Sequence, residues 1–156
     1  MIGRLLIALG LVLALAVPVG AAAEKDPVKI TADNFVVDDE AHVATFTGSV
    51  VVKRNELTVW APKVVVEYGE EGPSSIKTFV ASGGVRIKTD DQDATGDYAI
   101  YDPLAETLKI TGNVMVINES STVGGPDLVI DLRTNLTTFT GGTQKGGRVT
   151  GVFTAQ

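Results

Sequence analysis

Residues 44–52 read Ala44-Thr-Phe-Thr-Gly-Ser-Val-Val-Val52, an alternating run that reaches a glycine and continues into three β-branched residues. The pattern returns at Gly84-Val-Arg-Ile87 and at Gly112-Asn-Val-Met-Val116. Each copy follows an alternating apolar and polar run, and a second strand-like run comes after a polar stretch. One supersecondary unit is therefore written several times, which predicts a stacked or rolled all-β body.

The second strand of each unit also repeats, and it is aligned in three copies: Ala61-Pro-Lys-Val-Val-Val-Glu-Tyr68, Ala94-Thr-Gly-Asp-Tyr-Ala-Ile-Tyr101 and Gly124-Gly-Pro-Asp-Leu-Val-Ile-Asp131. A fourth copy, Ile30-Thr-Ala-Asp-Asn34, opens the mature region, and a degenerate last unit combines residues 138–141 with residues 148–153. Runs of Gly, Pro, Asn, Asp and Ser separate these segments and favour turns. The pattern predicts about ten to fourteen short antiparallel strands with half-units at both ends.

Composition excludes several classes of function. The 156 residues carry a formal net charge of −6, whereas binding to nucleic-acid phosphates requires a basic surface. The chain has no cysteine, so neither a disulfide framework nor a thiolate metal site is available. Once a leader is removed, residues 24–156 are enough for one domain with a hydrophobic core. We expect no cofactor and no metal.

The first 23 residues have the features of a cleavable signal peptide. A short region with one positive charge, Met1 to Arg4, precedes an apolar stretch from Leu5 to Val17, and Ala21-Ala-Ala23 provides a small-residue cleavage site. Cleavage after Ala23 is the expectation. The alternative is a retained anchor, because Leu5 to Ala23 approaches the roughly 20 residues that a spanning helix needs. Both readings place residues 24–156 outside the cytoplasm.

The strands have one apolar and one polar face when they are read with a period of two. Phe46, Val50 and Val52 alternate with threonine, serine and lysine, and the runs around Phe79 and Ile110 do the same. An ordinary sandwich core explains one buried face. Aromatic residues make up only 6% of the chain, however, so a rolled sheet lined by valine and isoleucine has room to leave space along its axis.

The order of these segments resembles the OstA-like (LptA) family of periplasmic lipopolysaccharide-transport proteins. The resemblance rests on Ile30-Thr-Ala-Asp33, Ala44-Thr-Phe-Thr-Gly-Ser-Val-Val-Val52, Leu57-Thr-Val-Trp-Ala-Pro-Lys-Val-Val-Val66, Leu108-Lys-Ile-Thr-Gly-Asn-Val114 and Lys145-Gly-Gly-Arg-Val-Thr150. It covers essentially all of the mature chain, from Val28 to Phe153. It implies an all-β fold, an open and twisted antiparallel β-jellyroll, and no enzymatic activity.

The resemblance also implies a function and partners. Such a protein shields the acyl chains of lipopolysaccharide in a groove and joins head to tail into a bridge from the inner to the outer membrane. Its partners are an LptC-like inner-membrane protein at the N-terminal edge, the amino-terminal domain of an LptD-like translocon at the C-terminal edge, and other copies of itself. The predicted groove is lined by Val28, Ile30, Phe46, Val50, Val52, Val64, Val66, Phe79, Val85, Ile87, Ile100, Leu108, Ile110, Val114, Val116, Leu128, Ile130 and Phe139.

Other candidate sites have simpler explanations. His42 is the only histidine and lies in a polar turn without a serine or cysteine partner. Residues 91–102 approach a calcium-loop pattern, but strand-like runs flank them where that loop needs helices. Trp60 is followed by Ala61-Pro62, so a packed aromatic at a strand kink is a stronger reading than a sugar platform.

Two other classes of function remain open at this point. A β-solenoid carbohydrate enzyme would need a fixed pair of carboxylates, and the sequence fixes none. A membrane-anchored, LptC-like relative of the same transport system would retain residues 5–23 in the membrane and receive lipid first.

Overall fold

The computed structural model describes residues 27–142 and 147–155; the predicted signal peptide, residues 1–23, lies outside these ranges. The described residues form ten β-strands and no helix, which confirms the all-β prediction. The strands are β1 (Lys29–Thr31), β2 (Asn34–Asp38), β3 (Val43–Arg54), β4 (Leu57–Gly69), β5 (Gly72–Lys88), β6 (Asp93–Asp102), β7 (Thr107–Ile117), β8 (Ser121–Asp131), β9 (Leu136–Thr140) and β10 (Thr150–Phe153).

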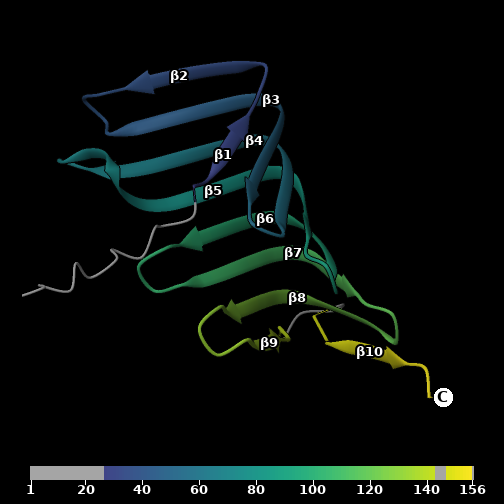
Figure 1. Cartoon of the computed structure of the whole chain (residues 1–156). Helices are drawn as coiled ribbons and strands as arrows, with labels where there is room; N and C mark the ends of the chain where they lie inside the picture. Colours follow the sequence, from purple (N-terminus) through teal and green to yellow (C-terminus); the bar gives the residue numbers. More distant parts are fainter. Residues whose placement is uncertain (1–26, 143–146, 156) are drawn as a thin grey trace, which may run out of the picture.

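All ten strands belong to one antiparallel sheet. Strands β3 to β8 pair in chain order, so consecutive strands form hairpins. Both β1 and β2 pair with β3, and both β9 and β10 pair with β8. Figure 1 shows the strands stacked in this order, from β1 and β2 at one end to β9 and β10 at the other. The sheet is therefore open, with a free edge at each end.

Every long strand crosses a corner near its middle, where the pairing changes register. The breaks lie between Thr47 and Val50, Trp60 and Lys63, Ser82 and Val85, Thr95 and Tyr98, and Thr111 and Val114. They divide the sheet into two layers. Layer I comprises residues 34–47, 63–82, 98–111 and 127–140, and layer II comprises residues 29–31, 50–61, 85–96, 114–125 and 150–153.

The two strands of a hairpin cross the corner with different numbers of residues. Gly48 and Ser49 of β3 lie opposite the single residue Pro62 of β4, and β5 likewise has two residues where β6 has only Asp97. A crossing of two residues keeps the alternation of inward and outward side chains, whereas a crossing of one residue reverses it. The inward positions of β4, β6 and β8 therefore change parity at the corner, and those of β3, β5 and β7 do not.

Glycine is required where the backbone turns the corner in β7. Gly112 has a φ of 80°, and its neighbour Asn113 also has a positive φ, 48°. A Cβ atom added at Gly112 would lie 2.8 Å from Cβ of Asp97. The Asn113 amide Nδ2 donates a hydrogen bond to Oδ2 of the same Asp97, at 3.0 Å. Asp97 thus lies against the turn, which only a residue without a side chain allows.

The interior between the layers is apolar. Rows of paired residues cross the sheet, and one row brings together Phe46, Val64, Ala81, Ala99, Ile110, Leu128 and Phe139. Side chains of both layers form a single cluster, in which Ile110, Leu128 and Val50 have no exposed surface. No polar or charged residue is buried among the described residues. Burial of aliphatic side chains is therefore the main stabilising contribution.

We expect Gly112→Ala to lower the free energy of unfolding by about 3 kcal/mol, because alanine adds both a strained left-handed conformation and a clash with Asp97. The matched control is Gly84→Ala, since Gly84 has a φ of 96° but no atom within 4 Å of its added Cβ. That control should cost only about 1 kcal/mol. Urea denaturation of the two variants measures both values, and equal losses would show that the Asp97 contact is unimportant.

Candidate functional site

The predicted groove residues, with one exception, lie in the interior between the layers. Eleven of them are buried in the core: Val50, Val64, Val66, Phe79, Val85, Ile87, Leu108, Ile110, Val114, Val116 and Leu128. Six more are partly buried and pack against that core: Val28, Ile30, Phe46, Val52, Ile130 and Phe139. The apolar faces read from the sequence thus meet in one place. Their contact with lipid remains a prediction.

The exception is Ile100, which lies on the outer face of layer I. Its paired neighbours are Val80 of β5 and Lys109 of β7, both of which point away from the interior. The prediction for this residue was wrong because β6 crosses the corner with the single residue Asp97, which reverses the alternation. Ala99 and Tyr101 occupy the inward positions instead.

Several interior residues were missed by the sequence prediction. They include residues of three strands: Leu57 and Val59 at the start of β4, Ile76 and Ala81 of β5, and Ala99 and Tyr101 of β6. Alternation counted separately on each side of the corner identifies Ala99 and Tyr101. The alanines carry little apolar signal of their own, so their position is apparent only from the strand register.

Residues in the described part of the chain line two apolar cavities between the layers. The first, of about 60 Å³, is lined by residues of both layers, with Tyr101 among them. The second, of about 190 Å³, lies toward the β1 and β2 end and is lined by Phe35, Phe46 and Ile76, among others. Val28 and Phe79 line both. Ligand pockets usually measure about 300–1,000 Å³, so both cavities are smaller than an ordinary ligand pocket.

The margin opposite the corner is called the mouth here and is defined by Arg54, Leu57, Tyr101 and Leu132. These residues line the first cavity near the hairpin tips of the two layers. Arg54 ends β3 in layer II, and its Nη1 atom donates a hydrogen bond of 2.8 Å to the hydroxyl of Tyr101 in layer I. The Tyr101 ring packs against Phe79, with 5.9 Å between centroids. A polar contact therefore joins the layers at the opening of an apolar space.

Both ends of the sheet expose large apolar side chains. At the β2 edge, Phe35 and Val36 are 57% and 63% exposed, and at the β10 edge, Val152 and Phe153 are 64% and 73% exposed. In this structure β1, β2, β9 and β10 each pair with a neighbour on one side only. Edge strands with exposed apolar residues are suited to receiving another strand.

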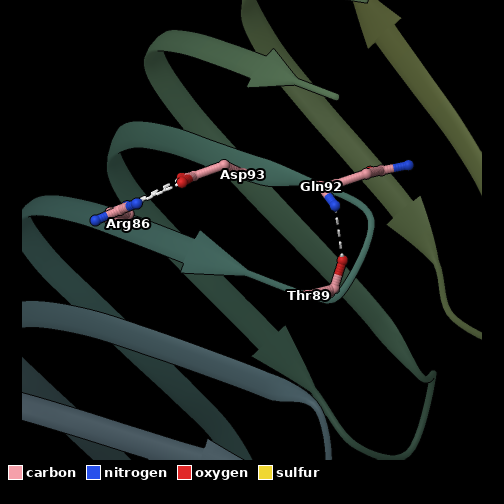
Figure 2. Close-up of polar contacts among 4 residues, drawn as sticks. All are labelled: Arg86, Thr89, Gln92 and Asp93. Atoms are coloured by element: carbon pink, nitrogen blue, oxygen red, sulfur yellow. Dashed lines mark hydrogen bonds and ion pairs between the residues drawn. The ribbon is translucent and has the colours of Figure 1, made fainter. Parts of the chain in front are cut away.

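The outer face of layer II carries a polar contact between β5 and β6. Arg86 Nε lies 3.0 Å from Oδ1 and 3.2 Å from Oδ2 of Asp93, and in the adjoining turn the backbone N–H of Gln92 donates to the Thr89 hydroxyl (Figure 2). The Arg86 guanidinium also lies 5.3 Å from the centre of the Trp60 ring. Trp60 is thus packed beneath an ion pair on the sheet surface.

This ion pair affects stability weakly. The hydrogen bond from Arg86 lowers the pKa of Asp93 from its usual value. A lowered pKa in the folded state adds stability above the unfolded pKa, near 3.9, and that stability is lost as the pH falls through the lowered value. Because the pair is partly exposed, solvent screening keeps the contribution small.

Two of the remaining candidate residues, His42 and Asp91, lie in turns, whereas residues 93–102 of the calcium-like stretch form β6. His42 lies in the turn after β2, with its ring edge-on to Tyr68 at 5.8 Å between centroids. Asp91 lies in the turn between β5 and β6. From that same turn, Asp90 raises the pKa of Glu56, which lies in the turn between β3 and β4, by charge repulsion. Within residues 27–142 and 147–155, no three histidine or acidic side chains come together in a way that could hold a metal ion.

Comparison with known proteins identifies the family. A family model described as the LptA/(LptD N-terminal domain) lipopolysaccharide transport protein matches residues 29–136. The chain belongs to this family. It is a family of transport proteins, and the match confirms the resemblance seen in the sequence. In the described part of the chain, no helix has the length and apolar character to span a membrane.

Individual relatives agree with this family. The lipopolysaccharide export system protein LptH of Pseudomonas aeruginosa is 26% identical over 149 residues, which cover 92% of this chain and 79% of LptH. The uncharacterized protein R00383 of Rhizobium meliloti is 28% identical over 132 residues, or 79% of this chain and 68% of that protein. The crystal structure of P. aeruginosa LptH matches with a TM-score of 0.73 at 20% identity, covering 83% of this chain and 96% of that chain. This structural match confirms the open jellyroll fold.

Inward and outward substitutions on β7 should differ sharply. Ile110 has no exposed surface, so Ile110→Asp would bury an unpaired carboxylate and should cost about 4 kcal/mol or more in the free energy of unfolding. Lys109→Asp, on the outer face of the same strand, should change it by less than about 0.5 kcal/mol. Thermal and urea unfolding measure the difference. Similar losses for both variants would mean that the faces of β7 are wrongly assigned.

Proposed function

We propose that this protein is exported to the periplasm and carries lipopolysaccharide from the inner toward the outer membrane, with the acyl chains held between layers I and II. The single observation that carries this proposal is the apolar interior, which runs between the layers from the β1 and β2 end to the β9 end. Membership of a lipopolysaccharide transport family and the relationship to LptH support it. The seventeen inward residues of the predicted groove are the proposed lining.

Energetics favour such a lining. Exposing an acyl chain costs about 0.8 kcal/mol per methylene, so a chain of about a dozen carbons costs on the order of 10 kcal/mol in water. An interior without buried polar groups in its described part can offset that cost along its whole length. A lining with polar groups could not offset the cost in this way, because each desolvated polar group left without a hydrogen-bond partner reduces the gain in free energy.

Lipid entry requires the layers to move apart. The two cavities are smaller than a ligand pocket of ordinary size, and the space is filled by valine, isoleucine and phenylalanine side chains. Within the sheet, the two layers are connected only at the corner. The mouth can therefore widen without breaking the strand pairing there. We propose that acyl chains replace contacts between the layers as they enter.

We propose that the two ends join partners of the same system. An LptC-like inner-membrane protein would pair with β1 and β2, and the amino-terminal domain of an LptD-like translocon would pair with β9 and β10. Copies of this chain would pair head to tail in the same way. Strand direction supports this arrangement, because β10 and β1 run in opposite senses in the sheet and would continue it as antiparallel neighbours. Such contacts are heterologous, so they need not close.

A photo-crosslinking amino acid at Phe79 should form an adduct with lipopolysaccharide, because Phe79 lines both cavities. The same amino acid at Lys109, on the outer face, should form little or none. Purified protein is incubated with lipopolysaccharide, irradiated and separated on a denaturing gel with detection of the lipid. Equal adducts at both positions, or none at Phe79 in a protein that still folds, would contradict acyl-chain binding between the layers.

Assembly should depend on the exposed apolar residues at the ends. Phe153→Lys should raise the dissociation constant for self-association at least about tenfold, because a charge would be buried in the junction. Leu104→Lys is the matched control, since Leu104 is 85% exposed in the turn after β6, away from both ends. Sedimentation over a range of concentrations measures both. A wild type that stays monomeric, or a Phe153 variant that assembles equally well, would rule out the head-to-tail junction.

A further inference from the structure

The contact between Arg54 and Tyr101 is the polar link across the mouth. Arg54 occupies an inward position of β3, two residues beyond Val52, and Tyr101 occupies an inward position of β6. Their side chains are both half-buried, and 2.8 Å separate Nη1 of the arginine from the tyrosine hydroxyl. The residues are 47 positions apart in the chain and belong to different layers.

Arg54 differs from Arg86 and Arg133 because those two arginines form ion pairs. Arg86 is paired with Asp93, and Arg133 lies 3.6 Å from Asp131. No carboxylate lies within salt-bridge distance of Arg54 in the part of the chain that the structure describes. A guanidinium has five N–H donors in a planar fork, and here one nitrogen is engaged by a neutral hydroxyl. The charge of Arg54 is therefore not balanced by a neighbouring carboxylate, and its other N–H donors are able to bind an acidic partner.

The surroundings of Arg54 restrict what that partner can be. The cavity beside it is lined by apolar side chains, among them Leu57, Phe79 and Leu132. The chain as a whole carries a net charge of −6, so its long-range field repels anions, and an anion must be held by direct contact. A cation at the opening of an apolar space matches a molecule that carries an acidic group next to hydrocarbon chains.

We propose that Arg54 binds the phosphate group of an acylated lipid whose hydrocarbon chains enter the interior, and that Tyr101 holds the guanidinium at the mouth in the empty protein. This inference rests on the proposed function. Arginine binds phosphate oxygens through two parallel, charge-assisted hydrogen bonds, which are stronger than a bond to a neutral hydroxyl. When phosphate takes the place of Tyr101, the link between the layers is released, so binding of the headgroup and opening of the mouth occur together.

The test compares two lipids that differ only in their phosphate groups. The probes are hexa-acylated lipid A with both phosphates and the same lipid with the phosphates removed, and the readout is the dissociation constant for the mature protein. Arg54→Gln should weaken binding of the phosphorylated lipid about tenfold and leave binding of the other lipid unchanged. Lys53→Gln removes the same charge from the neighbouring outward position and should change neither value more than twofold.

Tyr101→Phe separates a binding role from a structural one. It frees the guanidinium without removing it, so affinity for the phosphorylated lipid should stay the same or rise. Inorganic phosphate, which has no acyl chains, should compete poorly even at millimolar concentration. Thermal unfolding of each variant confirms that it is folded.

The outcomes distinguish this inference from the proposed function. If wild-type protein binds both lipids but Arg54→Gln weakens them equally, or if Tyr101→Phe weakens binding as much as Arg54→Gln does, Arg54 has no role in phosphate recognition and only this inference fails. Strong competition by inorganic phosphate would show that Arg54 belongs to a site for free anions and not to a site for a lipid headgroup. If wild-type protein binds neither lipid, the proposed function fails as well.

Discussion

The corner is the constraint on which the rest of this structure depends. Every long strand must bend at the same height, so that two layers face each other with apolar side chains between them. A bulge achieves this locally, because the extra residue on one strand increases the bend and leaves pairing intact on either side. The glycines at positive φ and the aspartate packed against Gly112 fix where the bend occurs. The apolar interior follows from this repeated local geometry.

The sequence predicts the strands, the repeat and most of the larger aliphatic residues of the interior, because alternation is strong on each side of the corner. It fails where the alternation reverses. Ile100 and Tyr101 illustrate this, since β6 crosses the corner with the single residue Asp97, and this exchanges which of them points inward. A reversal of this kind depends on how many residues of each strand lie at the corner. That number is set by the register of the paired strands and cannot be read from one strand alone. The cavities and the contact between Arg54 and Tyr101 form where the two layers face each other. No local sequence pattern specifies which residues meet across the layers.

The interior filled by side chains represents a compromise between stability and capacity. A protein of this size must bury most of its aliphatic side chains to remain folded, and interiors are normally close-packed. An interior kept open for several acyl chains would lose those contacts whenever it is empty. Filling the space with valine and isoleucine, which both layers contribute, gives the empty protein a core. Under the proposed function, lipid would substitute for one half of that core.

The edge strands have a mechanical consequence. At each end the sheet is bordered by two short strands, β1 and β2 or β9 and β10, and the members of each pair lie in different layers. A joint formed through one strand would act as a hinge about a single line. A joint formed through both has two separated lines of attachment, which resist rotation as well as stretching. The twist of one sheet would then pass to the next, and the interiors of successive molecules would stay in line as one continuous helical track.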